Sequence, residues 1–404
     1  MTQLSVILNR INTGFIAVLV GFTSTVALIY QAAINLGGDL QLVSSWIFAL
    51  GLGMGVTSIG LSLYYRVPLL IAWSTPGAAL LISGTQGFTI NQAVGAFLFS
   101  AALITLAGMT GWFEKVMNKI PQQIASAMLA GILINFGINT FNLMNQQAPL
   151  VLTMLITYLV CKHTLPRYTM LAVLIAGFGA AWSMQLIDWP QLQWQMSELE
   201  YIQPELSLPA FISIGLPLFI VTMASQNMPG IAVLKAHDYH PPVSRTITVT
   251  GLVNMLIAPF GGFGINLAAI TAAICMTENA DADPDKRYWS AVAAGVFYIL
   301  MGMSAVSLMT LFESLPSALI LALAGIALLS TIGTSLQQAL SSPRYSEAAL
   351  LTLLVTASDL MLWHIGSALW GALAGLTTLM VQNLLSKHSK KHAKKQSSTA
   401  ARRA

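Results

Sequence analysis

The stretch VPLLIAWSTPGAALLISG, residues 67–84, has the length and apolar character of a membrane-spanning segment, but its middle is unsuited to a continuous helix. Residues 73–77 read WSTPG, which combines two hydroxyls with a proline and a glycine. Irregular backbone at membrane depth is tolerated only where protein buries it or where it lines a cavity. We therefore predict a discontinuous span, in which an extended lead-in precedes a half-helix that Ser74 or Thr75 caps and that has Pro76 in its first position.

The rest of the chain shares this apolar character. Of its 404 residues, 56% are hydrophobic and 8% are charged, whereas a soluble domain carries about 25% charged residues. This composition predicts an all-α polytopic membrane protein. The sequence contains no P-loop, hydrolase elbow or dinucleotide fingerprint, and the histidines of HDYH (237–240) have no further metal ligands beside them. We therefore expect no enzymatic activity, no cofactor, no metal and no nucleic-acid partner.

Apolar windows long enough to cross a membrane core of about 30 Å occur fourteen times. They lie at 13–35, 44–64, 67–84, 91–112, 122–142, 148–163, 168–187, 210–229, 243–259, 261–277, 288–309, 315–340, 346–363 and 367–385. The third and tenth windows are short and interrupted by glycine and proline. All 18 Lys and Arg residues fall in the termini or in loops on one side of these windows. This positive-inside bias predicts an even number of spans and cytoplasmic N- and C-termini.

The two halves of the chain resemble each other. IPQQIASAMLAGILINFG (120–137) corresponds to LPSALILALAGIALLSTIG (315–333). Internal repetition is typical of transporter folds, and halves of seven spans must enter the membrane from opposite sides. We therefore predict two inverted seven-span repeats, an external loop between them, and a disordered basic tail that can contact anionic membrane lipid. The repeats cover 1–190 and 210–385, the external loop covers 191–209, and the basic tail covers 386–404.

The tenth window, APFGGFGINLAAITAAICMTE (258–278), is broken at the same relative place as the third. Its glycines at 261–264 precede a helix that we expect to resume near Asn266, which would take the N-cap role. Broken spans at equivalent repeat positions indicate a transport site near the bilayer midplane. Two half-helix starts that face each other would present backbone N–H groups and partial positive charge, which suits a carboxylate. The alternative is that these residues only kink packed helices.

Other polar and aromatic residues complete the predicted site. Ser225-Gln226-Asn227 ends an apolar run in span eight, where adjacent amides are costly unless they pair or face a cavity; the alternative is that they join helices. Aromatic residues of the broken spans are candidate ring walls or ordinary packing residues. Asp359 and Glu278, at span ends, are candidate proton carriers. The predicted substrate-binding set is Trp73, Ser74, Thr75, Pro76, Gly77, Ser225, Gln226, Asn227, Phe263, Gly264 and Asn266.

Four stretches carry a resemblance to a known family: RVPLLIAWSTPGAALL (66–81), PLFIVTMASQNMPGIA (217–232), PVSRTITVTGLVNMLIAPFGGFGINLAAITAAIC (242–275) and LAGIALLSTI (323–332). They resemble the benzoate:proton symporter family of the BenE type, and the resemblance covers essentially the whole chain. It implies proton-coupled uptake of benzoate across a bacterial inner membrane. It also implies the fourteen-span inverted repeat of nucleobase and sulfate transporters, in which a core domain moves against a gate domain, often in a homodimer.

On that pattern the core domain would comprise spans 1–4 and 8–11 (13–112 and 210–309), and the gate domain spans 5–7 and 12–14 (121–187 and 315–385). Nucleobase transporters hold their substrate with acidic residues in spans eight and ten, where this chain has Ser225-Gln226-Asn227 and Ile265. An acidic residue would repel a carboxylate substrate. We therefore expect a proton-coupled importer of benzoate or a similar small aromatic carboxylate that works by alternating access. The alternatives are a same-fold transporter of a nucleobase or another small anion, and an ion channel.

Overall fold

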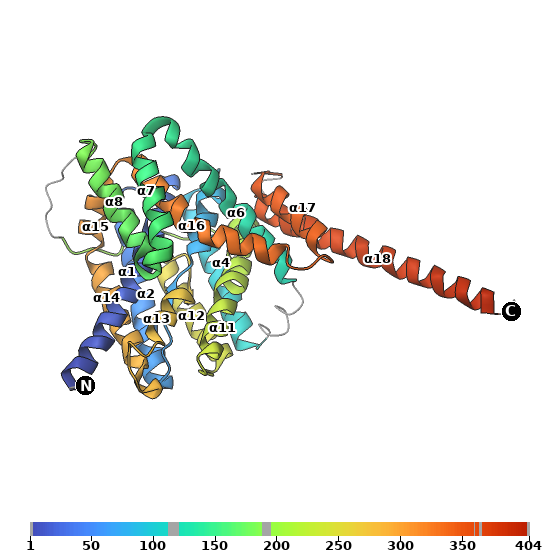
Figure 1. The fold of residues 1–404 in the computed structure, drawn as a ribbon, viewed down its shortest axis with the longest axis horizontal. Helices are drawn as coiled ribbons and strands as arrows, with labels where there is room; N and C mark the ends of the chain where they lie inside the picture. Colours follow the sequence, from blue (N-terminus) through green and yellow to red (C-terminus); the bar gives the residue numbers. More distant parts are fainter. Residues whose placement is uncertain (1–2, 112–120, 188–194, 359, 363–365, 402–404) are drawn as a thin grey trace.

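The computed structural model describes residues 3–111, 121–187, 195–358, 360–362 and 366–401. Its helices form one bundle, from which the C-terminal helix α18 (Ser367–Ala401) projects sideways (Figure 1). The described elements are predominantly helical, which confirms the predicted helical membrane fold.

The helices follow the predicted windows closely. The first half contains α1 (Gln3–Asn35), α2 (Leu40–Tyr65), α4 (Ile90–Met109), α6 (Gln122–Asn142), α7 (Met144–Thr164), η1 (Pro166–Tyr168) and α8 (Thr169–Ser183). Span eight is a composite of α9 (Leu208–Ala210), η2 (Phe211–Gly215), α10 (Leu216–Thr222), η3 (Met223–Asn227) and α11 (Met228–Ala236). The remaining helices are α12 (Val243–Ile257), η4 (Ala258–Phe260), η5 (Pro284–Lys286), α14 (Tyr288–Met303), α15 (Ala305–Glu313), α16 (Ser317–Ala339) and α17 (Ser346–Ala357).

Fewer of the described helices are long enough to cross a membrane than the fourteen spans that the sequence predicted. In the described part of the chain, eight continuous helical segments, counting the composite span eight as one, are long and apolar enough to cross a membrane, and the pair α14 and α15, bent by 62°, would make a ninth. Helices α8 and α17 are apolar but shorter. Every predicted window coincides with at least one helical or strand–helix element, whereas the number of complete crossings stays a prediction.

The two broken spans meet in a short antiparallel strand pair. Strand β1 (Ile71–Trp73) leads into helix α3 (Thr75–Gly84), and strand β2 (Ile265–Leu267) precedes helix α13 (Ile270–Cys275). The sequence predicted extended lead-ins, but it did not predict that they pair with each other. The register joins Ile71 with Leu267, Ala72 with Asn266, and Trp73 with Ile265.

Pairing gives hydrogen-bond partners to the backbone of both strands, because hydrocarbon cannot hydrogen-bond the N–H and C=O groups of an extended segment. The ladder pairs one edge of each strand, and side chains form hydrogen bonds with backbone groups on the other edge. On the β1 edge, the Ser58 hydroxyl of α2 accepts from the Ile71 N–H at 2.9 Å. One turn further on, Ser62 accepts from the Leu69 N–H and donates to the Leu69 carbonyl, both at 3.1 Å.

Amides satisfy the β2 edge in the same way. Asn254 of α12 accepts from the Ile265 N–H at 2.6 Å and donates to the Ile265 carbonyl at 2.9 Å. Asn227 of η3 accepts from the Leu267 N–H at 3.0 Å. We call the four side chains that hold the strand edges the edge clamps. Asn254 follows Ser58 by 196 positions, so clamps of the two halves occupy corresponding places, as an inverted repeat requires.

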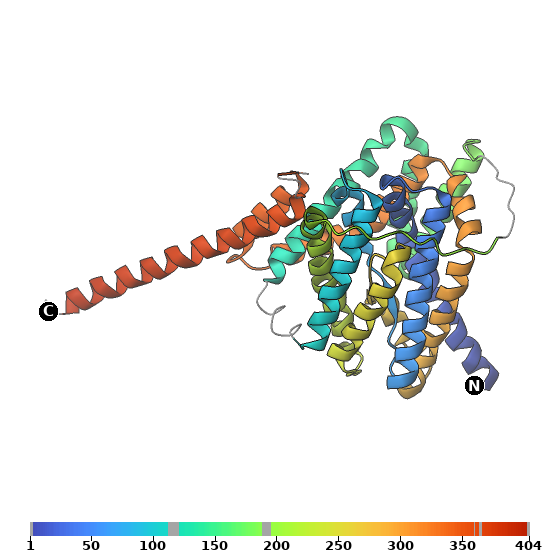
Figure 2. The same cartoon turned by 180° about the vertical axis from the view of Figure 1, so that it is seen from behind.

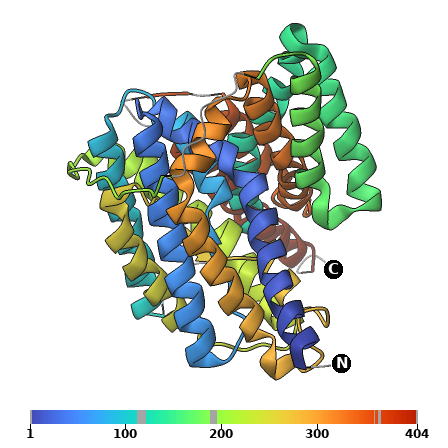
Figure 3. The same cartoon turned by 90° about the vertical axis from the view of Figure 1, so that its left-hand side faces the viewer.

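The helices pack in two sets. Around the strand pair, α2 packs on α14, α4 on α12, and α1 on α3, α13 and α14. In the second set, α6 packs on α16 and α17, α7 on α8, and α17 on α18. Figure 3 shows α7 and α8, in green, on the side of the bundle opposite to α12. The sets touch where α1 meets α16 and where α3 meets α6.

An extended segment, residues 195–206, crosses the helix ends of the first set (Figure 2). We call it the strap. Its backbone N–H groups donate to α2, α4, η4 and α14, so the strap ties that set together. The bonds run from Glu200 to the Ser45 hydroxyl at 2.8 Å, from Glu205 to the Asn91 carbonyl at 3.0 Å, from Ile202 to the Pro259 carbonyl at 2.7 Å, and from Ser197 to the Met303 carbonyl at 2.9 Å.

The basic tail differs from its prediction. Helix α18 continues without a break from the last span to Ala401, where we expected disorder after 385. Residues 386–404 contain five Lys and four Ala, and both residue types favour helix. Because the preceding span is already helical, the tail extends a helix without the cost of nucleating a new one.

Candidate functional site

Helix α3 begins where the sequence placed it. Ser74 is its N-cap, because the Ser74 hydroxyl accepts from the Gly77 N–H at 3.1 Å. Pro76 occupies the second helical position instead of the predicted first. Its missing N–H costs little there, since first-turn N–H groups have no partner within a helix. Gly77 leaves no room for a side chain, because an added Cβ would lie 2.8 Å from Leu218 and from the Ser74 hydroxyl.

Hydroxyl groups from three helices gather at this helix start. A hydrogen bond of 2.8 Å joins the hydroxyls of Thr75 and Thr25 of α1, and Thr222 of α10 donates to Ser74 at 3.5 Å. Thr25, Ser74 and Thr222 are buried, whereas Thr75 is partly exposed. The start of α3 is therefore a cluster of neutral donors and acceptors.

Asn266 does not cap a helix, and that prediction is wrong. Asn266 lies in the middle of β2, and α13 begins at Ile270 with Ala269 as an N-cap that offers no side-chain hydrogen bond. The reason is that β2 has to stay extended through Leu267 to complete its ladder with β1. The two half-helix starts are consequently unequal, since α3 follows its strand directly and the six-residue α13 is set back from its own.

The carboxamide of Asn266 is unpaired. The residue is fully buried, and neither Oδ1 nor Nδ2 has a hydrogen-bond partner within the described part of the chain. Opposed residues of an antiparallel pair project to the same face, so Asn266 shares a face with Ala72, which is partly exposed. The other face of the pair is buried throughout. An unpaired buried amide costs about 1–3 kcal/mol, which marks a place where a polar group of a ligand can bind.

Span eight is wound more loosely at its polar motif. Met223–Asn227 forms a π-helical turn, and such turns are frequent at functional sites. Asn227 is fully buried and serves as an edge clamp, so it positions β2. Ser225 and Gln226 are only partly buried. That these two residues contact the substrate stays a prediction, whereas the Asn227 carboxamide oxygen already accepts a hydrogen bond from the backbone.

The predicted ring walls are well packed. The Trp73 ring lies 6.0 Å from the Phe22 ring and 6.4 Å from the Tyr298 ring. The Phe263 ring lies 6.2 Å from each of two aromatic rings, in α2 and α4. Trp73 is 3% exposed and Phe263 2% exposed. Both rings act as packing residues here, and their contact with a substrate stays a prediction.

Two glycines before β2 differ in what they require. Gly261 has a φ of +87°, and an added Cβ would collide with the Trp46 indole, so only glycine fits. Gly264 has more room, since the nearest atom to an added Cβ, in Ser74, is 3.7 Å away. The Gly264 carbonyl accepts from the Ser74 N–H at 3.0 Å. Gly264 therefore joins the two broken spans through its backbone.

The candidate proton carriers lie elsewhere or outside the described residues. Glu278 is exposed in the turn that follows α13, and Asp359 lies outside the part of the chain that the structure describes. Their coupling role stays a prediction.

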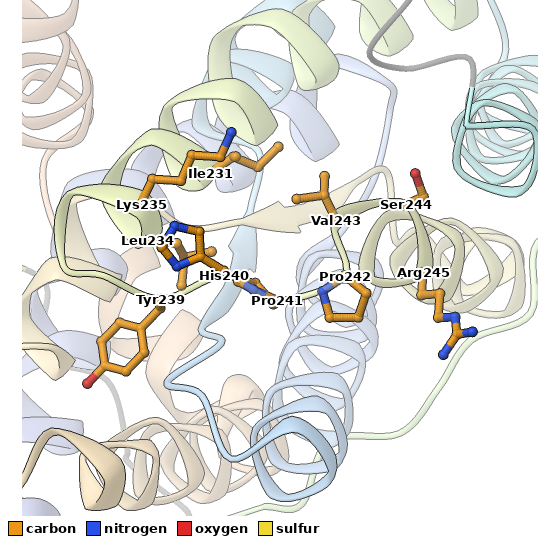
Figure 4. Close-up of a pocket in the computed structure, with 10 residues that line it drawn as sticks. All are labelled: Ile231, Leu234, Lys235, Tyr239, His240, Pro241, Pro242, Val243, Ser244 and Arg245. Carbon is orange, nitrogen blue, oxygen red and sulfur yellow. The ribbon is translucent and has the colours of Figure 1, made fainter.

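A pocket of about 430 Å³ lies where α11 connects to α12, and no residue of the strand pair lines it (Figure 4). Lys235, His240 and Arg245 line it, and Arg245 points away from His240. Tyr239 donates to the Pro284 carbonyl at 2.8 Å, and burial raises the pKa of its phenol. None of the predicted site residues lines this pocket, and its cations diverge. It therefore does not serve as the enclosed site for a small substrate.

Sequence reasoning missed the residues that hold the site together. These are the edge clamps Ser58, Ser62 and Asn254, and the hydroxyl of Thr222. One signal was present for Asn254, because an amide inside an apolar span is costly without a partner. Its place, 196 positions after Ser58, pairs it with a polar residue that also precedes a broken span.

Comparison with known sequences identifies relatives along nearly the whole chain. The family model "BenE: Benzoate membrane transport protein" matches residues 5–381. The inner membrane protein YdcO of Escherichia coli (strain K12) is 46% identical over 372 residues, which cover 92% of this chain and 95% of YdcO. The benzoate membrane transport protein of Acinetobacter baylyi is 36% identical over 368 residues, which cover 91% of this chain and 93% of that protein.

Solved structures share the fold at low sequence identity. The transmembrane domain of the cyanobacterial bicarbonate transporter BicA matches with a TM-score of 0.62 at 13% identity, over 91% of this chain and 97% of that one. SLC26A9 matches with a TM-score of 0.62 at 11% identity, over 93% of this chain and 66% of that one. These likenesses show a transporter fold. The sequence relatives are the stronger finding, and they place the chain in a membrane transport family and not an enzyme family, as predicted: it belongs to the BenE family of benzoate membrane transport proteins.

Proposed function

We propose that this protein imports benzoate or a similar small aromatic carboxylate together with a proton, by alternating access. The family match supports a benzoate-type substrate. Within the chain, one observation carries the proposal: spans from the two halves break at the same place and meet in a buried strand pair. Broken spans that meet between inverted repeats are typical of the binding sites of secondary transporters.

The carboxyl group of the substrate binds beside the strand pair, between the hydroxyl cluster at the start of α3 and the unpaired amide of Asn266. Ser225 and Gln226 of span eight complete the polar surface. These groups are all neutral. A site of neutral donors and acceptors without ionised side chains suits the carboxyl group of an aromatic acid, which can form hydrogen bonds with both kinds of group.

The helix set that surrounds the strand pair forms a core that moves against the set built on α6, α7, α8, α16, α17 and α18. The strap supports this division, because the four backbone bonds given above all reach the core set. The placement of all 18 Lys and Arg residues supports cytoplasmic termini in a bacterial inner membrane. The protein works as a homodimer, with the basic end of α18 near anionic lipid. Cross-linking in membranes and labelling of a cysteine at the tail test these last points.

Uptake into liposomes by the purified protein tests the function. Radiolabelled benzoate should accumulate when an inward proton gradient is imposed, and a protonophore should abolish the accumulation. Empty liposomes are the control, because neutral benzoic acid crosses bilayers unaided. Accumulation of uracil or bicarbonate without benzoate uptake would favour a different substrate on the same fold. A benzoate current that never accumulates substrate against a gradient would favour a channel.

A further inference from the structure

The proton that accompanies the substrate needs a carrier, and the strand pair lies in a region without charge. The sequence contains no Asp, Glu, His, Lys or Arg in 11–38, 67–113, 206–234 and 246–277. These ranges include both strands, both half-helices, most of α1 and nearly all of span eight. The usual side chains that carry a proton through a transporter are therefore missing from the region where the substrate binds.

Two weakly ionisable side chains remain near the pair. They are the phenol of Tyr298 in α14, whose ring lies 6.4 Å from the Trp73 ring, and the thiol of Cys275 at the end of α13. Free phenols and thiols have pKa values of about 10 and about 8.5, so neither exchanges a proton readily near pH 7. The charged and histidine residues on elements packed around the pair, including their caps, lie at or near helix ends: Arg10, Asp39, Arg66, Lys235, His237, Arg245 and Arg287.

The start of α3 offers few free donors to an anion. Pro76 has no N–H, the Gly77 N–H is taken by the Ser74 hydroxyl at 3.1 Å, and the Ala78 N–H is taken by the Ser74 carbonyl at 2.8 Å. The hydroxyls of Thr75 and Thr25 form a hydrogen bond with each other, which uses one of their two hydrogens. A buried carboxylate would thus lose its hydration without gaining a cation or a full set of donors, which is costly.

The unpaired amide of Asn266 is complementary to a neutral carboxylic acid rather than to a carboxylate. A carboxamide presents an N–H donor beside a C=O acceptor, and a carboxylic acid presents a C=O acceptor beside an O–H donor. The two groups can therefore close a ring of two hydrogen bonds. A carboxylate only accepts, so it would leave Asn266 Oδ1 facing a negative charge. Both polar atoms of Asn266 are free within the described part of the chain, and the neutral acid uses both.

We propose that the site binds its substrate as the neutral carboxylic acid, so that the proton crosses on the substrate itself. This inference rests on the proposed function. The carboxylate takes a proton from water outside, the acid binds and crosses, and it loses the proton to the cytosol. One proton enters with each molecule and no net charge moves. A transported anion would instead be opposed by the membrane potential, by about fiftyfold per 100 mV.

The pH dependence of exchange tests the inference, with the same pH on both sides of the vesicle. An ordinary carboxyl group with a pKa of about 4 is protonated in about one molecule per thousand at pH 7. The KM for total benzoate should therefore rise about tenfold per unit between pH 6 and pH 8. Benzamide, a neutral analogue with a donor beside an acceptor, should compete with an inhibition constant that does not change with pH.

A KM that stays flat over this range, or benzoate entry that carries a current, would overturn the inference while leaving benzoate transport intact. Absence of any benzoate exchange by the wild-type protein would instead refute the proposed function. The two failures are therefore distinguishable in one preparation.

Variants locate the proton. Asn266→Leu should raise the KM for benzoate at least tenfold and abolish inhibition by benzamide, while Tm stays the same or rises, because no hydrogen bond of the protein is lost. A lower Tm with an unchanged KM would make Asn266 purely structural and overturn its role. Tyr298→Phe and Cys275→Ser should keep one proton per benzoate. Loss of coupling with retained exchange in either variant would place the proton on that side chain and overturn the inference.

Discussion

Replacing Asn254 by leucine should release strand β2 from helix α12. Asn254 is 2% exposed and holds both backbone groups of Ile265, the N–H at 2.6 Å and the carbonyl at 2.9 Å. Leucine has a similar volume but no polar atom. The substitution therefore leaves two backbone groups without a partner in a place that water does not reach, and it changes little else.

Each unsatisfied buried group costs about 1–3 kcal/mol, so the variant should lose about 2–6 kcal/mol of stability. One kcal/mol shifts Tm by about 2–4 °C in chains of 150–250 residues, and by less in longer ones. We therefore expect Tm to fall by about 5 °C. The register of β2 also sets Asn266 opposite Ala72, so a strand that loosens should raise the KM for benzoate as well.

Thermal unfolding in detergent, followed by intrinsic fluorescence, measures the shift, and benzoate exchange is measured on the same preparation. Asn266→Leu is the matched control, because it replaces the same residue type in the same strand pair but removes no hydrogen bond. Asn254→Ser copies the corresponding clamp Ser58 and should recover part of the loss. An unchanged Tm for Asn254→Leu would refute the reasoning that side chains satisfy the strand edges.

Three further changes test other parts of the structure. Gln226→Ala should raise the KM for benzoate about fivefold with no change in Tm, since a hydrogen bond to substrate is worth about 1 kcal/mol; an unchanged KM removes Gln226 from the site. Gly261→Ala should lower Tm by several degrees because its φ is +87° and an indole blocks the Cβ, whereas Gly264→Ala should not; the opposite order would contradict the structure. The hydrogen bond from Lys286 lowers the pKa of Asp283, so Lys286→Met should raise that pKa toward its ordinary value in an NMR titration. Because the pKa of Asp283 is lower in the folded than in the unfolded state, the ion pair stabilises the folded protein at pH values above the unfolded-state pKa. The small stabilisation by this exposed pair should therefore be present at pH 7 and be lost as the pH falls below about 4. An unchanged pKa of Asp283 in the variant would show that the ion pair does not form.

Local chemistry in the sequence was enough to predict the broken spans. Ser74, Pro76 and Gly77 specify a helix start within a few residues, and the structure has Ser74 as the N-cap with extended backbone before it. Such signals depend on contacts between neighbours along the chain. The equivalence of 67–84 and 258–278 could also be predicted, because both halves keep the same spacing.

What the sequence did not predict depends on partners in the other half of the chain. Asn266 has the local features of a helix cap, and the ladder with β1 is what keeps it in a strand. Asn227 and Gln226 are adjacent amides of equal local character. Only the structure assigns the first to the backbone of Leu267 and leaves the second partly exposed. Distant pairing and burial separate residues that look alike in sequence.

The strand pair also constrains how the protein is made. Ile265 follows Ile71 by 194 positions, so a ribosome working at 5–20 residues per second needs about 10–40 s to supply the partner of β1. Until then, β1 has the hydrogen bonds of Ser58 and Ser62 but no partner strand. We expect that the first half, expressed alone, is degraded, and that the two halves, expressed as separate chains in one cell, accumulate only when both are present.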